Sequence, residues 1–320
     1  MPLMEFALIA RYFTRPARRP DVLQGIGDDC ALLRVPAGME LAVTIDTLVS
    51  GVHFPVDTSP YAIGWKTLAV SLSDLAAMGA VPAWVTLALT LPEADGVWLD
   101  AFSRGLFDLA DQYDLALVGG DTTRGPLAIT LQAHGFIPPG QSLRRTGAQA
   151  GDLIYVTGTL GDAAVGLELR LGRWSGSVTS VDGDYLSNRL DLPQPRVLAG
   201  LALRGIASAA IDLSDGLGAD LGHILEASVV GARVYLNRLP CSPALKRLTV
   251  PWEKIMAGGD DYELCVTVPP VRQKLFDQAL ATAGCDFTLI GEIQAAPGII
   301  WVDAKGEAVE IDATGYRHFS

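Results

Sequence analysis

The stretch Leu41-Ala-Val-Thr-Ile-Asp-Thr-Leu-Val49 is apolar and rich in β-branched residues, and it carries one carboxylate in its interior. This composition predicts a strand in the body of the fold. A buried carboxylate is costly unless it is paired, hydrogen-bonded or bound to a metal ion. Asp46 therefore marks both a structural element and a candidate site.

Other carboxylates have similar surroundings, within apolar runs or beside glycines. They are Asp28, Asp29, Asp74, Asp121, Asp212 and Asp215. A turn or capping role explains Asp28 equally well, but Asp74 lies inside the helix-like run Leu68–Met78, where no cap is needed. Few Lys or Arg residues are near these acids in sequence, so we expect a cation from outside. Oxygen ligands next to glycine loops favour Mg²⁺ and phosphate.

The bulk composition is that of a packed, acidic protein. With 320 residues the chain exceeds the usual size of one core, which predicts two domains. A net charge of −12 and a pI of about 4.7 argue against binding to nucleic acid or to an anionic membrane. Its four cysteines are scattered without a CxxC pair, which favours reduced structural thiols over a zinc site. No secretory signal is visible, so we expect a cytoplasmic protein.

Apolar periodicity and turn residues predict the order of elements. The expected helices are 5–13, 60–78, 95–113, 163–171, 217–228 and 271–283. The expected strands are 41–49, 84–91, 115–118, 127–137, 153–157, 209–213, 262–268, 287–293 and 299–302. Residues 174–184 are expected to form a surface loop. Strands outnumber what simple βαβ alternation needs, so the fold class is predicted to be α+β, with two α/β domains that each have a mixed sheet covered by helices.

The proline and glycine residues of Pro138-Pro-Gly-Gln-Ser142 mark a domain boundary. The predicted domains are therefore residues 1–138 and 139–320. Two motifs recur at similar spacing in these halves: Ser73-Asp-Leu75 precedes Gly119-Gly-Asp121, and Ser214-Asp-Gly216 precedes Gly258-Gly-Asp260. This recurrence suggests an internal duplication.

Glycine turns and one arginine pair are the candidate phosphate ligands. Gly25-Ile-Gly27, Gly119-Gly120 and Gly158-Thr-Leu-Gly161 offer backbone N–H groups. No GxxxxGK[ST] sequence occurs, and no GxGxxG follows a strand, which disfavours ordinary P-loop and Rossmann folds. Arg144-Arg145 is the best cationic candidate, with a solvated surface pair as an equally good interpretation.

The motifs occur in one order over nearly the whole chain and closely resemble those of the thiamine-monophosphate kinase family. The segments that carry the resemblance are Gly25–Ala31, Asp46–His53, Leu72–Gly79, Gly119–Thr123, Ile211–Gly216 and Gly258–Leu264. The resemblance implies the fold of aminoimidazole ribonucleotide synthetase. Its N-terminal domain is expected to bind metal and ATP and to form a homodimer, and its C-terminal domain to complete the nucleotide and substrate site.

The resemblance also implies an activity, the ATP-dependent phosphorylation of thiamine monophosphate to thiamine diphosphate without a phosphoenzyme, assisted by several Mg²⁺ ions. The positions that match magnesium ligands are Asp29, Thr44, Ile45, Asp46, Asp74, Asp121, Asp212 and Asp215. Those that match nucleotide contacts are Gly120, Asp121, Arg145 and Ser214, and those that match substrate contacts are His53, Glu263 and Tyr316. Asp46, Asp74 and Asp121 are expected to be catalytic.

Two positions depart from the family pattern. Ile45 stands where a polar residue is frequent, so only its backbone carbonyl can contact a metal ion. Tyr316 stands where Trp is frequent, which leaves a smaller aromatic wall for a planar cation.

The expected chemistry suits these residues. The substrate joins a cationic thiazolium to an anionic phosphate, so Glu263 and Tyr316 suit the cation, whereas metal ions and Arg145 suit the phosphates. No strong base is apparent, and none is needed, because the acceptor is a phosphate oxygen that is already ionised near neutral pH. In-line attack on the γ-phosphoryl group is expected.

Other classes of protein remain open at this point. One is another ATP-using enzyme of the same superfamily, although neither the start Met1-Pro-Leu-Met nor the end Tyr316–Ser320 has the cysteine that a selenophosphate synthetase or a hydrogenase-maturation enzyme would need. A metal-dependent phosphohydrolase also uses clustered aspartates. The third class is a nucleotide-binding module without catalysis.

Overall fold

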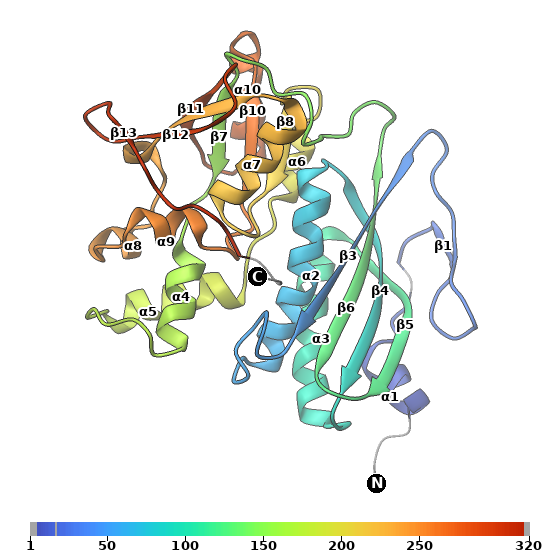
Figure 1. Ribbon diagram of the computed structural model, residues 1–320. Coiled ribbons are helices and arrows are strands. Elements are labelled where there is room, and N and C mark those ends of the chain that lie inside the picture. Colours follow the sequence, from blue (N-terminus) through green and yellow to red (C-terminus); the bar gives the residue numbers. More distant parts are fainter. Residues whose placement is uncertain (1–4, 17, 317–320) are drawn as a thin grey trace. The chain divides into compact units, whose positions relative to one another are not determined.

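The computed structural model describes residues 5–16 and 18–316, and the chain divides into two compact units (Figure 1). Unit 1 comprises Met1–Leu75 and Ala80–Gly140, and unit 2 comprises Ala76–Gly79 and Gln141–Ser320. The boundary predicted after Pro138 lies beside this division. Within the described residues, no helix has the length and apolar character needed to cross a membrane.

Unit 1 is built on a four-stranded mixed sheet. Its strands are β3 (Glu40–Val49), β4 (Val81–Leu91), β5 (Ala116–Arg124) and β6 (Ala128–Ile137), in the spatial order β3-β6-β4-β5. Strand β6 is antiparallel to β3 and β4, and β4 is parallel to β5. Its other elements are α1 (Glu5–Tyr12), the ribbon of β1 (Val22–Gln24) and β2 (Leu32–Leu33), α2 (Pro60–Ala77), α3 (Gly96–Ala110) and the 3₁₀ turn Asp111–Tyr113. Helices α2 and α3 lie on one face of the sheet (Figure 1).

Helix α2 lies deep in unit 1 because it is apolar on almost every side. It approaches α3 so closely that a Cβ on Gly64 would lie 2.0 Å from the Phe102 carbonyl oxygen. A Cβ on Gly105 would lie equally close, 2.0 Å from the carbonyl oxygen of Tyr61. Glycine is therefore required at both contacts between α2 and α3.

Unit 2 contains a seven-stranded mixed sheet in the order β13-β12-β9-β11-β7-β10-β8. Its strands are β7 (Leu153–Thr157), β8 (Ala209–Asp212), β9 (Gly231–Tyr235), β10 (Leu264–Val268), β11 (Phe287–Gln294), β12 (Gly298–Val302) and β13 (Ala308–Val309). Its helices are α4 (Asp162–Arg170), α5 (Ser180–Asp191), α6 (Val197–Ala202), α7 (Leu217–Ser228), α8 (Pro243–Arg247), α9 (Trp252–Ala257) and α10 (Gln273–Ala283), with 3₁₀ turns at Leu236–Arg238 and Pro270–Arg272. Strands β9 and β12 are parallel and the other pairs antiparallel. Both sheets are thus mixed, and the predicted α+β class is confirmed.

The structure differs from the predicted elements in several places, and it contains α6, α8, α9, β1, β2 and β13, for which no element was predicted. Helix α5 begins inside the segment 174–184 that was predicted as a surface loop, because the Thr179 hydroxyl caps it by accepting the Asp182 N–H. Strand β5 continues to Arg124 rather than ending at Val118, so Gly119 and Gly120 belong to a strand and not to a loop. Strand β9 was not predicted, since it is short and carries a charged residue in its middle.

The suggested internal duplication is not supported by the local structure. Ser73 and Asp74 lie inside α2, whereas Ser214 and Asp215 lie in the loop between β8 and α7. Gly119-Gly-Asp121 is part of β5, whereas Gly258-Gly-Asp260 follows the end of α9. The paired motifs therefore occupy different kinds of element, and the two sheets differ in strand number and order.

Candidate active site

Three predicted metal ligands meet between β3 and α2. Thr44 and Asp46 alternate with exposed residues along β3, so both side chains face α2. The Thr44 hydroxyl donates to Asp74 Oδ2, and the Ser71 hydroxyl donates to Asp46 Oδ2 at 2.6 Å. Ser71 and Asp74 are three residues apart on α2, a spacing that places them on one face of the helix.

The surroundings of Asp46 favour the arrival of a cation. Burial raises the pKa of the Asp46 carboxyl, while the hydrogen bond from Ser71 and the charge of His53 lower it in part. His53 is fixed by the Val49 backbone N–H, which donates to its Nδ1 at 3.0 Å. A partly buried carboxylate held mainly by a hydroxyl gains free energy when a metal ion binds. Ser71 was not predicted as a site residue. Its position three residues before Asp74 in a predicted helix could have indicated that the two side chains share one face.

A second group of predicted residues lines a cavity of about 680 Å³ beside β5. Asp28 and Asp29, from the loop after β1, lie on its wall together with Gly120 and Asp121 of β5. Phe6 of α1 contributes apolar surface to the same cavity. A volume of this size suits a small-molecule ligand, and the polar and apolar parts of the wall suit a phosphorylated one.

Gly120 is required by the sheet itself. Its φ is +151°, and a Cβ there would lie 1.9 Å from the Leu87 carbonyl oxygen. Any side chain would push β5 away from β4 and move Asp121, the next residue, with it. Gly120 therefore has a structural role whether or not it contacts a nucleotide.

The two groups of acids lie at opposite edges of the unit 1 sheet. Strand β3, with Asp46, is the first strand of the sheet, and β5, with Asp121, is the last. Strands are spaced about 4.8 Å apart, so three spacings separate these edges by roughly 14 Å. Within the described residues, no three His, Cys, Asp or Glu side chains are arranged to hold a metal ion. A magnesium cluster shared by Asp46 and Asp121 stays a prediction.

The predicted residues of unit 2 gather at the loop between β8 and α7. Asp212 is buried at the end of β8, and Ser214 and Asp215 follow in the loop. The Tyr316 N–H donates to the Asp215 carbonyl oxygen at 3.3 Å, which brings the half-exposed tyrosine beside the same loop. Arg145 is exposed elsewhere in the unit, with its carbonyl oxygen accepting from Ser228.

Asp220, which the sequence did not single out, holds this loop in shape. Its Oδ2 accepts the backbone N–H groups of Asp215 at 3.0 Å and of Gly216 at 3.1 Å. Burial raises the pKa of Asp220 to about 7, and the negative charge of Asp215 adds to the effect, while backbone hydrogen bonds oppose it. Asp220 was not predicted because it lies within helix α7, where nothing in the surrounding sequence distinguishes it from an ordinary polar helix residue.

Glu263, a predicted substrate contact, is completely buried. Arg189 donates to Oε1 at 2.9 Å, Arg196 donates to both oxygens at 2.6 Å, and the Thr157 hydroxyl donates to Oε2 at 2.5 Å. Burial raises the pKa of Glu263, but the hydrogen bonds and charges of Arg196 and Arg189 outweigh it and hold the pKa below its usual value. The sequence missed both arginines, since 74 and 67 residues separate them from Glu263.

One of the candidate phosphate-binding turns has its donors occupied. In the turn Gly158–Gly161, the Gly158 N–H donates to the Asp286 carbonyl oxygen, and the Gly161 N–H donates to the Asp261 carboxylate at 2.9 Å. A Cβ on Gly158 would lie 2.2 Å from Glu263 Oε1. The turn therefore packs against the acids of unit 2, and the N–H groups of Gly158 and Gly161 are already engaged within the protein.

Comparison with known proteins identifies first the class and then the family. Residues 27–137 match the AIR synthase related protein N-terminal domain, and residues 149–303 match the corresponding C-terminal domain. The chain thus has the two-domain fold of AIR synthase related proteins. It is 53% identical over 321 residues to thiamine-monophosphate kinase of Escherichia coli (strain K12), covering 99% of this chain and 98% of that protein.

Solved structures agree with this assignment. Thiamine-monophosphate kinase from Stenotrophomonas maltophilia K279a is 51% identical, with a TM-score of 0.87 over 97% of this chain and 99% of that one. AaThiL complexed with AMPPCP and TMP is 32% identical, with a TM-score of 0.78 over 92% of each chain. The chain belongs to the thiamine-monophosphate kinase family, and it is an enzyme of the kinase class.

Proposed function

We propose that this kinase transfers the γ-phosphoryl group of ATP directly to the phosphate of thiamine monophosphate, which yields thiamine diphosphate. The observation that carries the proposal is the group of Thr44, Ser71, Asp46 and Asp74 between β3 and α2, in which carboxylates are held by hydroxyls. Phosphoryl transfer needs positioning and neutralisation of negative charge more than it needs covalent help from the protein. This group provides the anionic half of such a site.

The donor set fits magnesium. All the predicted ligands offer oxygen atoms, which Mg²⁺ prefers, and the raised pKa of Asp46 shows a carboxylate that a bound cation would stabilise. Bound magnesium would neutralise the charge that develops on the transferred group. The proposed ligands are Asp29, Thr44, Asp46, Asp74, Asp121, Asp212 and Asp215, with the backbone carbonyl of Ile45.

The remaining residues have roles in positioning. Gly120 and Asp121, beside the larger cavity, are proposed to contact the nucleotide, as are Arg145 and Ser214. His53 and Tyr316 are proposed to contact thiamine monophosphate. Glu263 supports this substrate indirectly, because its carboxylate holds Arg189 and Arg196. Asp46, Asp74 and Asp121 are proposed to be catalytic, and His53, Glu263 and Tyr316 are proposed to position the substrate.

The acceptor explains why the site lacks an obvious base. A phosphate monoester has its second pKa at about 6, so its attacking oxygen is ionised near neutral pH. The carboxylates are then free to hold a cation rather than to take a proton. The expected step is in-line: the acceptor oxygen forms a bond to the γ-phosphorus as the bond from that phosphorus to the bridging oxygen of ADP breaks.

An acceptor screen tests the activity. The chain is incubated with ATP and Mg²⁺, alone and with thiamine monophosphate, thiamine or other phosphorylated vitamins, and the products are identified by mass. The proposal expects thiamine diphosphate and ADP in equal amounts, only when thiamine monophosphate is present. Steady loss of ATP without an acceptor would indicate a phosphohydrolase instead.

We also propose that the enzyme is a homodimer that completes its sites between two chains. Asp46 and Asp121 lie at opposite edges of one sheet, roughly 14 Å apart by strand spacing, too far for one metal ion. On the face of β3 that points away from α2, Leu41, Val43 and Ile45 are 42%, 52% and 60% exposed. An apolar face of this kind favours pairing with a second copy, which can set β3 of one chain near β5 of the other.

Mixing two inactive variants tests this arrangement. Asp46→Asn and Asp121→Asn homodimers are dissociated, mixed and reassembled. If each site takes Asp46 from one chain and Asp121 from its partner, the mixed dimer has one intact site and activity returns to a measurable fraction of wild type. If each site lies within one chain, both chains of the mixed dimer are defective and no activity returns. Re-mixing either variant with itself is the control.

A further inference from the structure

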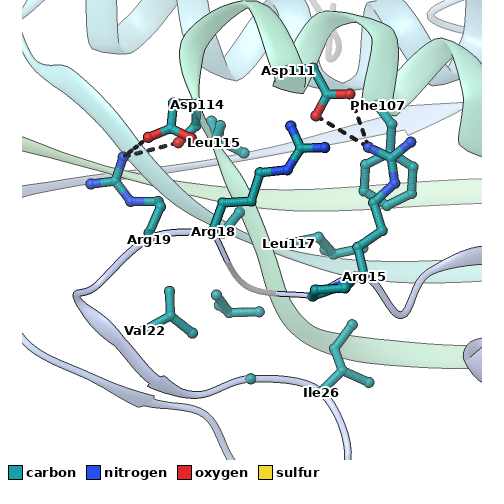
Figure 2. A pocket seen from close by; sticks show the side chains of 14 residues that line it. Arg15, Arg18, Arg19, Val22, Ile26, Phe107, Asp111, Asp114, Leu115 and Leu117 are labelled. Carbon is teal, nitrogen blue, oxygen red and sulfur yellow. Dashed lines mark hydrogen bonds and ion pairs between the residues drawn. The ribbon is translucent and has the colours of Figure 1, made fainter.

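A second cavity in unit 1, of about 360 Å³, is bordered by three arginines (Figure 2). Arg15, Arg18 and Arg19 contribute to its wall, and Val22, Ile26 and Leu117 contribute apolar surface. None of the residues assigned above to metal, nucleotide or substrate lines it. Its volume is in the range of small-molecule sites.

Two of the arginines are held in place by neighbours. The Arg15 guanidinium lies 3.7 Å from the centre of the Phe107 ring and 3.1 Å from an Asp111 oxygen. Arg19 donates to both oxygens of Asp21, at 3.0 and 2.7 Å. Fixed guanidinium groups lose little conformational entropy when a ligand binds.

Arg18 differs from both. It is exposed, and among the residues that the structure describes it makes no hydrogen bond or ion pair. Figure 2 shows its side chain extended over the cavity with no dashed line, whereas Arg15 and Arg19 are each joined to an aspartate. Arg18 is therefore the arginine of this wall that makes no ion pair with a described residue, whereas Arg15 is paired with Asp111 and Arg19 with Asp21 and Asp114.

We propose that this cavity binds a small organic phosphate or phosphonate with a flat apolar body. A guanidinium donates two parallel hydrogen bonds to a phosphoryl group, so Arg18 anchors the anion. The Phe107 ring with Arg15 above it, and the apolar surface of Val22 and Leu117, suit the rest of such a ligand.

The site is distinct from the larger cavity, although the two share part of their walls. Gly25, Ile26, Leu117 and Val118 line both. The described lining of the larger cavity contains Asp28, Asp29 and Asp121 and no Lys or Arg, so a phosphate needs a metal ion there. In the arginine-bordered cavity the Arg18 guanidinium, which makes no ion pair within the described part of the chain, can bind the anion itself, so binding there does not require metal.

Titration calorimetry with phenylphosphonate in EDTA tests the proposal. The wild-type chain is expected to bind one equivalent without metal, and to bind it equally when AMPPCP, Mg²⁺ and thiamine monophosphate are already bound. Arg18→Ala should weaken binding at least tenfold, and Arg18→Lys less. Arg238→Ala is the matched control, since Arg238 is also exposed and lies 4.4 Å from the centre of the Tyr235 ring in unit 2; it should bind as wild type does.

The outcomes separate the alternatives. Unchanged binding in Arg18→Ala, or loss of binding when the active site is loaded, would overturn the proposal. Inorganic phosphate should bind more weakly than phenylphosphonate, and equal affinity would overturn the part assigned to the apolar surface. The turnover number of Arg18→Ala without added phosphonate should equal that of wild type. Because binding is measured without turnover, the result does not depend on the identity of the kinase substrate.

Discussion

Two carboxylates, the partly buried Asp46 of unit 1 and the completely buried Glu263 of unit 2, are compensated in different ways. Asp46 in unit 1 accepts a hydrogen bond from the Ser71 hydroxyl, and burial raises its pKa. Glu263 in unit 2 is bound by two guanidinium groups, which hold its pKa below its usual value. Breaking a buried charge pair leaves an uncompensated charge and costs stability.

This difference distinguishes a residue that is proposed to bind a ligand, Asp46, from one with a structural role, Glu263. Asp46 is compensated only in part, by the Ser71 hydroxyl and the charge of His53, so a cation from solution would stabilise it further. A carboxylate that the fold neutralises completely contributes to the positions of the groups around it. The sequence suggested similar ligand-contacting roles for Asp46 and Glu263, and only the partners found in the structure distinguish them.

The largest expected effect is on activity, from Asp46→Asn. Loss of this carboxylate, a proposed metal ligand, should lower kcat roughly 10³-fold, a change of about 4 kcal/mol in the activation free energy. The metal-free variant should unfold at a temperature no lower than wild type, because the buried negative charge is gone. Activity assays and thermal unfolding in EDTA measure both.

Asp108→Asn is the matched control for this variant, since Asp108 is an exposed aspartate of α3 that accepts a hydrogen bond from Tyr61 at 3.0 Å. It should keep wild-type activity. A strong loss of metal-free stability in Asp46→Asn would contradict the comparison, because it would mean that the fold compensates Asp46 after all.

The next effect is on stability, from Glu263→Gln. Removing the charge breaks the buried ion pairs of Glu263 with Arg189 and Arg196, so the free energy of unfolding should fall by about 3–5 kcal/mol. Chemical denaturation measures it. Glu168→Gln is the control, because its ion pair with Lys254 at 2.7 Å is partly exposed and should cost less than about 1 kcal/mol.

A different outcome would mean that Glu263, like Asp46, has a role in ligand binding. If Glu263→Gln unfolds like wild type but has a strongly raised KM for thiamine monophosphate, the carboxylate faces the substrate, as the sequence alone suggested. The two arginines would then have to move when substrate binds.

A smaller effect is expected at Asp220. Asp220→Ala removes the acceptor of the Asp215 and Gly216 N–H groups, at a cost of about 1–3 kcal/mol, and should raise the Mg²⁺ requirement. Asp220→Asn keeps an amide oxygen in that place, so it should have nearly the wild-type stability and the wild-type Mg²⁺ requirement. Equal defects in the two variants would show that charge, not the acceptor, is what the loop needs.

The pH dependence of stability gives Asp220 a second readout. Its pKa is raised from 3.8 to about 7 in the folded state. Between these values the unfolded chain has lost the proton while the folded chain keeps it, so this contribution to stability is complete below about pH 4 and is lost as the pH rises toward 7. In EDTA, the free energy of unfolding of Asp220→Asn should lack this decline.

Much of the fold was readable from the sequence, because strong periodicity and caps are local signals. Helices α2 and α7 and strands β3 and β7 lie close to the ranges predicted for them. Strand β9 was missed because its place in the sheet is set by its neighbours β11 and β12 rather than by its own residues. The candidate residues were predicted from carboxylates that lie in apolar sequence and from the family resemblance. Their hydrogen-bond and ion-pair partners, such as Ser71, Arg189 and Arg196, were not predicted.

These partners could not be predicted from the sequence, for a physical reason. Arg189 and Arg196 meet Glu263 only after α5 and α6 have packed against the sheet of unit 2, so no local pattern marks them. The same holds for the distance between Asp46 and Asp121, which depends on strand order. Sequence reasoning identified which side chains were unusual, but their compensation is a property of the tertiary structure.

The smallest expected effect is at Thr44, and it tests how much a single hydroxyl contributes to metal binding by the acids of unit 1. The Thr44 hydroxyl donates to Asp74 Oδ2. Thr44→Val keeps the shape but removes this donor and a possible oxygen ligand, so the concentration of Mg²⁺ needed for half-maximal activity should rise up to about tenfold. Thr44→Ser keeps the hydroxyl and should stay near wild type.

The direction of the Thr44→Val result decides what the hydroxyl does. A raised Mg²⁺ requirement with unchanged kcat at saturating metal means that Thr44 helps to hold the cation or to orient Asp74 for it. A lowered requirement would mean that the hydroxyl competes with the metal for Asp74, as a built-in substitute that must be displaced. In that case the acids of unit 1 would be partly compensated by the fold, and their contrast with Glu263 would be one of degree.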